Sequence, residues 1–249
     1  MRYLMRIAYD GVGFHGWQRQ PADVSVQQTI EEALSKLLRS ETSVVGAGRT
    51  DTGVSAREMF AHFDSDLPEE YVISLVKALD NMAGRNVSVY EIRRVNDDFH
   101  ARFDARRRTY KYFVAVGKSP FGSHVWKSPK ALDFDRMNEA AALLLQIDDF
   151  TSFAKLHSDA KTNICKVDTA CWTPCVTPFS SPDVCYWEFT ISADRFLRNM
   201  VRAVVGTLID VGRGKTGIRD VERIIEGRDR CLAGTSMPPE PLFLWSVEY

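Results

Sequence analysis

Apolar and polar residues follow two different periods along the first hundred residues of the chain. Residues 2–9 alternate, which predicts a β-strand. Ser25 and Gln28 have the spacing of a capping box, and apolar residues then recur every three or four positions, which predicts an amphipathic helix. The same patterns predict strands at 2–9, 43–47, 58–65 and 87–95, a helix from Ser25 through Arg39 and a helix opening at Pro68.

The rest of the chain repeats this β-α-β-β-α-β order. Asp133 and Asp194 each precede a helical pattern, and Gly212 is a plausible C-cap for the second of these helices. A segment rich in Pro and Ser predicts a surface loop between two strands. The expected strands cover residues 109–116, 164–173, 184–192 and 242–249, and a short extra helix covers 218–226.

The repeated order predicts an α+β protein made of two ferredoxin-like halves. Their strands would form a continuous antiparallel sheet with the helices on one face. We place the division near residue 104, giving halves at 1–104 and 105–249. The open sheet face needs a cover, and RNA covers such faces in other proteins.

Charge is balanced overall but unevenly distributed. The chain of 249 residues has a formal net charge of −1. Residues 102–111 hold five Arg or Lys against one Asp, and residues 194–215 hold five against two. Clustered arginine in a neutral chain favours one positive face for a polyanion, although a solvated basic surface would look the same.

The sequence gives little support to a membrane protein or a secreted protein. The sequence lacks an apolar run of about 18 residues, which predicts no membrane helix. The first ten residues lack the apolar core of a signal peptide, so we expect a cytoplasmic protein. Four of the five cysteines cluster at 165–185, but their spacing fits no paired CxxC zinc site. Buried cysteine is the favoured interpretation, and we expect no metal.

The most unusual segment is Gly46-Ala47-Gly48-Arg49-Thr50-Asp51-Thr52-Gly53, between two expected strands. Its glycines permit tight backbone geometry. An aspartate held near the guanidinium of Arg49 stays ionised, which suits a nucleophile better than a general acid. A simple Asp-Thr-Gly turn is the alternative interpretation, and composition does not decide between them.

Two other enzyme classes share fragments of this sequence. Asp51-Thr52-Gly53 matches the tripeptide of aspartic proteases, but it occurs once in this chain, and a neighbouring Arg49 opposes a shared proton. Gly214-Lys215-Thr216 resembles the end of a phosphate-binding loop. The pattern requires glycine at Ile209 and a preceding strand, so we reject a nucleotide site.

Three groups of residues suit contact with RNA. Tyr110 and Tyr112 share one face of a strand beside a basic run, which combines stacking with charge, although core packing is the commoner role. Residues 14–20 form a polar-aromatic loop that positions RNA or supports the Asp51 loop. Arginines at helical spacing would form a stripe for bidentate phosphate contacts, and these are Arg195, Arg198 and Arg202.

In these motifs the chain resembles the tRNA pseudouridine synthase A family over essentially its whole length. Tyr9-Asp10-Gly11 with Gly16-Trp17-Gln18 resembles the opening motif of the family, and Gly48-Arg49-Thr50-Asp51 resembles its catalytic loop. Further matches follow in order. They are Asp98–Phe103, then Arg108, Tyr110 and Tyr112, Asp149–Phe153, Phe196-Leu197, Met200–Arg202, Gly206 and Leu242–Leu244.

The resemblance implies a pseudouridine synthase fold and a reaction on uridines at positions 38–40 of the tRNA anticodon stem-loop. Asp51 would be the nucleophile, Tyr110 would stack on the target uracil, and Arg202 would pair with Asp51. The resemblance also implies a homodimer that uses no metal and no organic cofactor. The implied substrate-binding residues are Arg19, Arg49, Arg106, Arg108, Tyr110, Arg195, Arg198 and Leu244.

The sequence also departs from the family pattern. Ser55 stands where the family commonly has histidine, and Asn81-Met82-Ala83-Gly84 replaces its usual Asn-x-Leu-Pro turn. Neither position carries an expected chemical role. A catalytically inactive RNA-binding module on the same fold is the other hypothesis, and a complete set of Arg49, Asp51, Tyr110 and Arg202 disfavours it.

Overall fold

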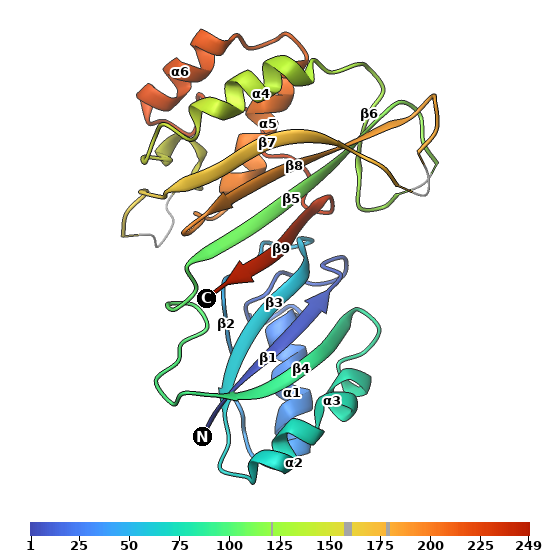
Figure 1. Cartoon of the computed structure of the whole chain (residues 1–249), viewed down its shortest axis with the longest axis vertical. Coiled ribbons are helices and arrows are strands. Elements are labelled where there is room, and N and C mark those ends of the chain that lie inside the picture. Colours follow the sequence, from blue (N-terminus) through green and yellow to red (C-terminus); the bar gives the residue numbers. More distant parts are fainter. Residues whose placement is uncertain (121, 157–160, 178–179) are drawn as a thin grey trace. The chain divides into compact units, whose positions relative to one another are not determined.

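The computed structural model describes residues 1–120, 122–156, 161–177 and 180–249. In the first part of the chain, β1 (Arg2–Tyr9) pairs antiparallel with both β3 (Ser55–Asp64) and β4 (Val87–Val95). The short β2 (Val45–Gly46) pairs antiparallel with the end of β3. β9 (Leu242–Glu248) runs parallel to the start of β3 (Figure 1).

Helix α1 (Val26–Leu38) packs with α3 (Val76–Met82). The short helices α2 (Glu69–Ser74) and α3 both contact β4, and they stand where one helix was expected from Pro68. Ser25 caps α1 as predicted, since its side chain accepts from the Gln28 N–H at 3.2 Å. The reciprocal half of the expected capping box differs. The Gln28 side chain donates to Glu32 Oε1 at 2.9 Å instead, one turn further along the helix.

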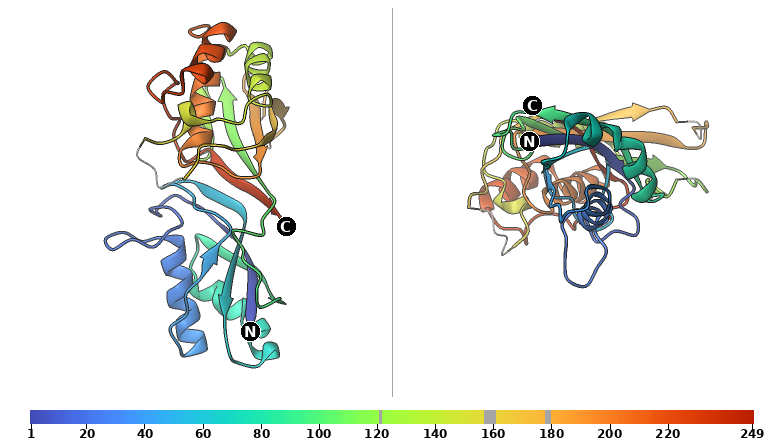
Figure 2. Two further views of the ribbon diagram at one scale, coloured as in Figure 1. Left: turned by 90° about the vertical axis from the view of Figure 1, so that its left-hand side faces the viewer. Right: turned by 90° about the horizontal axis from the view of Figure 1, so that it is seen from below.

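In the second part, β5 (Arg107–Val116), β8 (Cys185–Ala193) and β7 (Val167–Cys175) form an antiparallel sheet in the order β5-β8-β7. A short strand that the pattern did not predict, β6 (Trp126–Ser128), pairs parallel with β5. Helices α4 (Phe134–Leu143), α5 (Met200–Gly212) and α6 (Ile218–Gly227) pack together, with the 3-10 helix η1 (Thr151–Phe153) against α5 and α6 (Figures 1 and 2). Residues 178 and 179 of the expected Pro- and Ser-rich loop lie outside the described residues.

Helix α5 begins at Met200, and the prediction that Asp194 opens it is wrong. Asn199 has φ of 66°, a left-handed conformation that an α-helix does not continue through. The Asp194 side chain accepts instead from the backbone N–H groups of Lys166 and Arg195, at 2.8 and 2.7 Å. Arg195 therefore lies in a loop before the helix.

The end of α5 also differs from the prediction. Gly212 is the last helical residue rather than its cap, and Gly214 has the left-handed φ of 71°. A Cβ on Gly212 would lie 2.4 Å from the sulfur of Met137. Glycine at this position therefore allows α5 to approach α4 closely.

The chain clusters into two units, Met1–Arg106 with Phe243–Tyr249, and Arg107–Leu242. Both combine helices with mostly antiparallel strands, which confirms the α+β class. The last strand, assigned by pattern to the second half, belongs to the first unit through its pairing with β3. Division at 104 into two domains stays a prediction.

Candidate active site

Asp51 lies in the loop between β2 and β3, at the first position of a tight turn. The Val54 N–H donates to the Asp51 carbonyl at 3.1 Å, and Gly53 has φ of 78°. A positive φ at the third position strongly favours glycine in a turn of this kind. Asp51 is half-buried, whereas Arg49 is exposed two residues earlier.

The opening loop, residues 10–17, lies directly against this turn. Backbone bonds join the Trp17 N–H to the Thr50 carbonyl at 3.2 Å and the Gly53 N–H to the Phe14 carbonyl at 3.3 Å. A Cβ on Gly16 would lie 2.5 Å from the Thr50 carbonyl oxygen. The backbone on both sides of Asp51 is therefore fixed by contacts that leave no room for a larger residue.

Three buried hydroxyl groups complete the packing around the turn. The Tyr9 and Thr50 hydroxyls are hydrogen-bonded at 2.8 Å, and both residues are buried. Ser55, which replaces the histidine of the family pattern, is fully buried and accepts from the Gly11 N–H at 3.0 Å. The motif Tyr9-Asp10-Gly11 thus packs against the residues on either side of the Asp51 turn.

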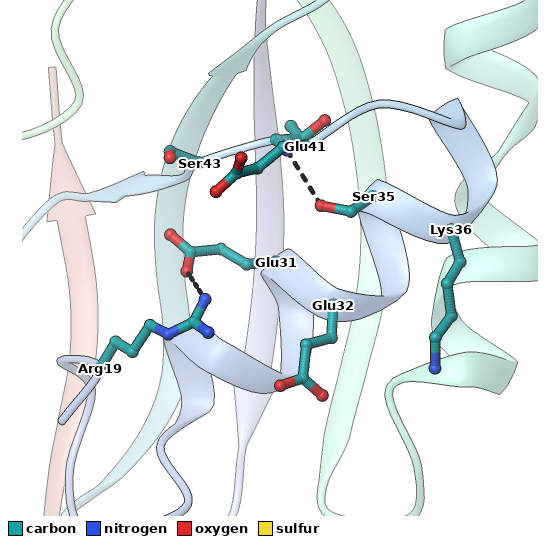
Figure 3. Close-up of a pocket in the computed structure, with 8 residues that line it drawn as sticks. Arg19, Glu31, Glu32, Ser35, Lys36, Glu41 and Ser43 are labelled. Atoms are coloured by element: carbon teal, nitrogen blue, oxygen red, sulfur yellow. Dashed lines mark hydrogen bonds and ion pairs between the residues drawn. The ribbon is translucent and has the colours of Figure 1, made fainter. Parts of the chain in front are cut away.

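Arg19 is directed towards helix α1. Its Nη1 lies 3.2 Å from Glu31 Oε2, beside an open depression of about 410 Å³ (Figure 3). Glu31 is almost buried and also accepts from the Val44 N–H at 3.0 Å. Arg19 therefore helps to join the segment after the opening loop to α1 and, through Glu31, to the segment entering β2. Its contact with substrate stays a prediction.

Leu244 and Arg106 also belong to the first unit. Leu244 pairs with Ala56, immediately after the Asp51 loop, and is 1% exposed. Arg106 is exposed, and its backbone N–H donates to the Glu248 carbonyl at 2.8 Å. The substrate contacts expected of both residues stay predictions.

Tyr110 and Tyr112 project from β5 in the second unit, and they differ in environment. The Tyr110 ring is half-buried and meets the Phe196 ring edge-on, with 4.9 Å between centroids. Tyr112 is fully buried, and its hydroxyl has no hydrogen-bond partner in the described part of the chain. Burial raises the pKa of the Tyr112 hydroxyl well above its usual range, and the charge of Arg202 opposes this only partly. Tyr110 is the better placed of the two for stacking on a base.

Arg202 is in the first turn of α5 and is half-buried. Its Nε donates to the Met237 carbonyl at 2.6 Å, and the Met237 N–H donates back to the Arg202 carbonyl at 3.1 Å. The guanidinium is thus oriented by a backbone group 35 positions away in sequence. Sequence patterns missed Met237 because a main-chain carbonyl has no residue type to recognise.

The arginine stripe expected on one helix is not present. Only Arg202 is helical, because α5 begins after Arg195 and Arg198. Arg195 is half-buried and Arg198 is exposed in the preceding segment. Arg108 donates from Nη1 to the Asp194 carbonyl at 2.7 Å, and so supports this segment. Phosphate contact by these residues stays a prediction.

Two basic residues on β5 form ion pairs with acidic residues on other strands of the sheet. Arg107 donates from Nη2 to Asp168 Oδ1 at 2.7 Å, and Lys111 Nζ lies 2.5 Å from Glu188 Oε1. These pairs neutralise two of the five cations that suggested a positive face. Among the described residues, no three His, Cys, Asp or Glu side chains form a cluster able to hold a metal ion.

Comparisons with known proteins define the class. The family model described as tRNA pseudouridine synthase matches residues 140–249. A tRNA pseudouridine synthase A from Bacteroides fragilis is 50% identical over all of this chain and 96% of its own length. Its counterparts from Porphyromonas gingivalis and Caldicellulosiruptor bescii are 49% and 38% identical, covering 100% and 99% of this chain and 97% and 98% of theirs.

These matches place the chain among the pseudouridine synthases, an isomerase class. More closely, the chain belongs to the tRNA pseudouridine synthase A family, which confirms the resemblance found in the sequence motifs. Within the described ranges, none of the helices has the length and apolar character needed to cross a membrane.

Proposed function

We propose that this enzyme isomerises uridine to pseudouridine at positions 38–40 of the tRNA anticodon stem-loop, with Asp51 as the nucleophile. The observation that carries the proposal is the fixed backbone around Asp51. Contacts from the opening loop hold both the Thr50 carbonyl and the Gly53 N–H. A carboxylate on a turn held by these contacts is already oriented when the substrate arrives, which lowers the entropic part of the barrier.

The chemistry requires one bond to break and another to form on the same base. The N1–C1′ bond of the uridine breaks, a C5–C1′ bond forms, the C5 proton leaves to solvent, and N1 takes up a proton from solvent. Asp51 attacks C1′ or C6, or removes the 2′ proton. A carboxylate serves in each case. The uridine must leave the helical stack first, which costs a few kcal/mol.

Other residues hold the extruded base and its backbone in this proposal. Tyr110 stacks on the uracil, a role supported by its half-buried ring. Arg202 pairs with the carboxylate of Asp51 in the working enzyme. The exposed cations Arg49, Arg106 and Arg198 suit phosphate contacts, which position RNA irrespective of its sequence. The substrate-binding set is completed by Arg19, Arg108, Arg195 and Leu244.

We further propose two ferredoxin-like halves, 1–104 and 105–249, acting as a cytoplasmic homodimer without cofactor. The strand order β4-β1-β3-β2 of the first unit supports the ferredoxin-like assignment, because it is the order of the β-α-β-β-α-β motif. Light scattering that returned a monomer would contradict the assembly.

The test is pseudouridine mapping by carbodiimide adduct and primer extension on an unmodified tRNA transcript, with no added metal or nucleotide. The wild-type protein should give stops at uridines 38–40, and transcripts with cytidine at these positions should lose them. Asp51→Asn should abolish the stops and retain tRNA binding, whereas Asp66→Asn, an exposed carboxylate elsewhere, should keep both. Binding by wild-type protein without any stops would support an inactive RNA-binding module instead.

A further inference from the structure

Residues 230–237, which we name the strap, lie on α5 close to Arg202. A Cβ on Gly206 would lie 1.9 Å from the Thr235 carbonyl oxygen, and a Cβ on Gly234 would lie 2.7 Å from the Thr207 nitrogen. Real Cβ atoms do not approach backbone so closely. Glycine on both surfaces therefore lets the strap and the helix meet backbone to backbone.

Three hydrogen bonds connect the strap to α5 across this contact. The Gly234 N–H donates to Thr207 Oγ1 at 2.9 Å. Met237 makes the other two, donating its N–H to the Arg202 carbonyl and accepting from Arg202 Nε. The orientation of the Arg202 guanidinium consequently depends on where the strap places the Met237 carbonyl.

Arg230 gives the strap its shape. From Nη1 it donates to the carbonyls of Ala233 and Gly234, at 3.3 and 3.0 Å, and from Nη2 it donates to Ser236 Oγ at 2.8 Å. The same Ser236 oxygen accepts from Asn199 Nδ2 at 2.6 Å, at the start of α5. One planar guanidinium therefore fixes three points within the strap, a geometry that lysine does not reproduce.

We propose that Arg230 is a positioning residue for the isomerisation, acting through the strap and the Met237 carbonyl on the guanidinium of Arg202. This inference rests on the proposed function, in which Arg202 pairs with Asp51. Arg230 does not itself touch the substrate in this scheme. Displacement of a catalytic group by about 1 Å lowers turnover by as much as about 100-fold, so a loosened strap acts on kcat.

The main test compares Arg230→Gln with Arg223→Gln in the wild-type background. Arg223 lies on α6 with its side chain 77% exposed, so its loss controls for removing one positive charge nearby. Arg230→Gln should lower kcat for tRNA pseudouridylation by about 10- to 100-fold with KM and tRNA affinity unchanged, and Arg223→Gln should change none of them. Equal kcat in the two variants would overturn the proposal.

A second arm separates positioning from general support of the fold. In an Arg202→Lys background, Arg230→Gln should cause little additional loss, because the group on which it acts has already been removed. A full additional loss of about 10- to 100-fold there would contradict the proposed route. Ser236→Ala, which removes one acceptor and leaves Arg230 in place, should show the same coupling with a smaller loss, and it serves if Arg230→Gln unfolds.

A third arm does not use activity, so it distinguishes failure of the inference from failure of the proposed function. The Arg202 Nε–H, assigned by its disappearance in Arg202→Lys, should exchange slowly with solvent in the NMR spectrum of the wild-type protein. Arg230→Gln should accelerate that exchange and Arg223→Gln should not. Unchanged exchange in Arg230→Gln would overturn the inference even if the enzyme is active, and accelerated exchange would sustain the geometric link even if tRNA is not modified.

Discussion

Replacing Gly16 by alanine is the most direct test of how the Asp51 loop is held. Gly16 has φ of 84°, and a Cβ there would lie 2.5 Å from the Thr50 carbonyl oxygen and 3.2 Å from the Asp51 carbonyl carbon. Both obstacles are backbone atoms, which cannot rotate away as the end of a flexible side chain can. The loop must therefore move for the variant to fold.

Two costs add in this variant. Holding alanine in a left-handed conformation costs about 1–2 kcal/mol. Forcing an extra carbon into a packed contact costs about 1–3 kcal/mol more. We therefore expect the free energy of unfolding to fall by about 2–5 kcal/mol, and kcat to fall by about 10- to 100-fold because the displaced peptide carries Asp51.

Two neighbouring glycines allow these costs to be separated. Gly13 has φ of 93°, but the atom nearest to its Cβ position is 4.0 Å away, so Gly13→Ala should lose only about 1–2 kcal/mol and keep its kcat. Gly48 has open space around its Cβ position, so Gly48→Ala should change stability by less than about 1 kcal/mol. Urea denaturation measures the free energies and tritium release from C5-labelled uridine measures turnover.

The decisive quantity is the difference between Gly16→Ala and Gly13→Ala. If the two variants lose the same free energy and retain the same kcat, the contact between the opening loop and Thr50 does not constrain the loop. The position of Asp51 would then have to be fixed by other contacts.

Two further predictions concern buried polar groups. Burial lowers the pKa of His62 to about 4, and its Nδ1 accepts from the Ala101 N–H at 3.0 Å. Because the unfolded state takes up this proton first, stability should fall as pH drops from about 6.5 to about 4, by about 3 kcal/mol at most. His62→Asn, whose amide oxygen replaces Nδ1, should flatten that slope in urea titrations, and an unchanged slope would assign it to other groups. Tyr112→Phe should leave the melting temperature unchanged or raise it, since the buried hydroxyl has no hydrogen-bond partner among the described residues. A drop of several degrees would reveal a bond to that hydroxyl.

Regular elements were predictable where apolar periodicity and a local cap agree. Residues 2–9 and 87–95 alternate, and both are strands over those residues. Asp133 caps α4 by accepting from the Arg136 N–H, as its pattern predicted. Asp194 also precedes a helical pattern, but its carboxylate accepts a hydrogen bond from the N–H of Lys166, which is distant in sequence. Long-range competition for one acceptor is invisible to a local pattern.

The candidate site likewise has a part that local sequence predicts and a part that depends on long-range contacts. The glycines around Asp51 indicated an unusual turn. Gly53 has a positive φ, a conformation that favours glycine, so this part of the site is visible in the residue types. The buried Tyr9–Thr50 bond joins residues 41 positions apart. The spacing of apolar and polar residues does not predict a contact over that distance in sequence. The orientation of the Arg202 guanidinium could not be predicted for a further reason. Its acceptor is the main-chain carbonyl of Met237, which no residue type marks in the sequence.

The pairing of β9 with β3 has a consequence for the order of assembly during synthesis. Ser55 and Ala56, which follow the Asp51 loop, pair with Phe243 and Leu244. At a translation rate of about 5–20 residues per second, these partners leave the ribosome roughly 10–40 s after the loop does. The nascent chain therefore carries the Asp51 loop beside an unfilled strand edge while the second unit is made. Completion of that edge is a late event in the biogenesis of the enzyme.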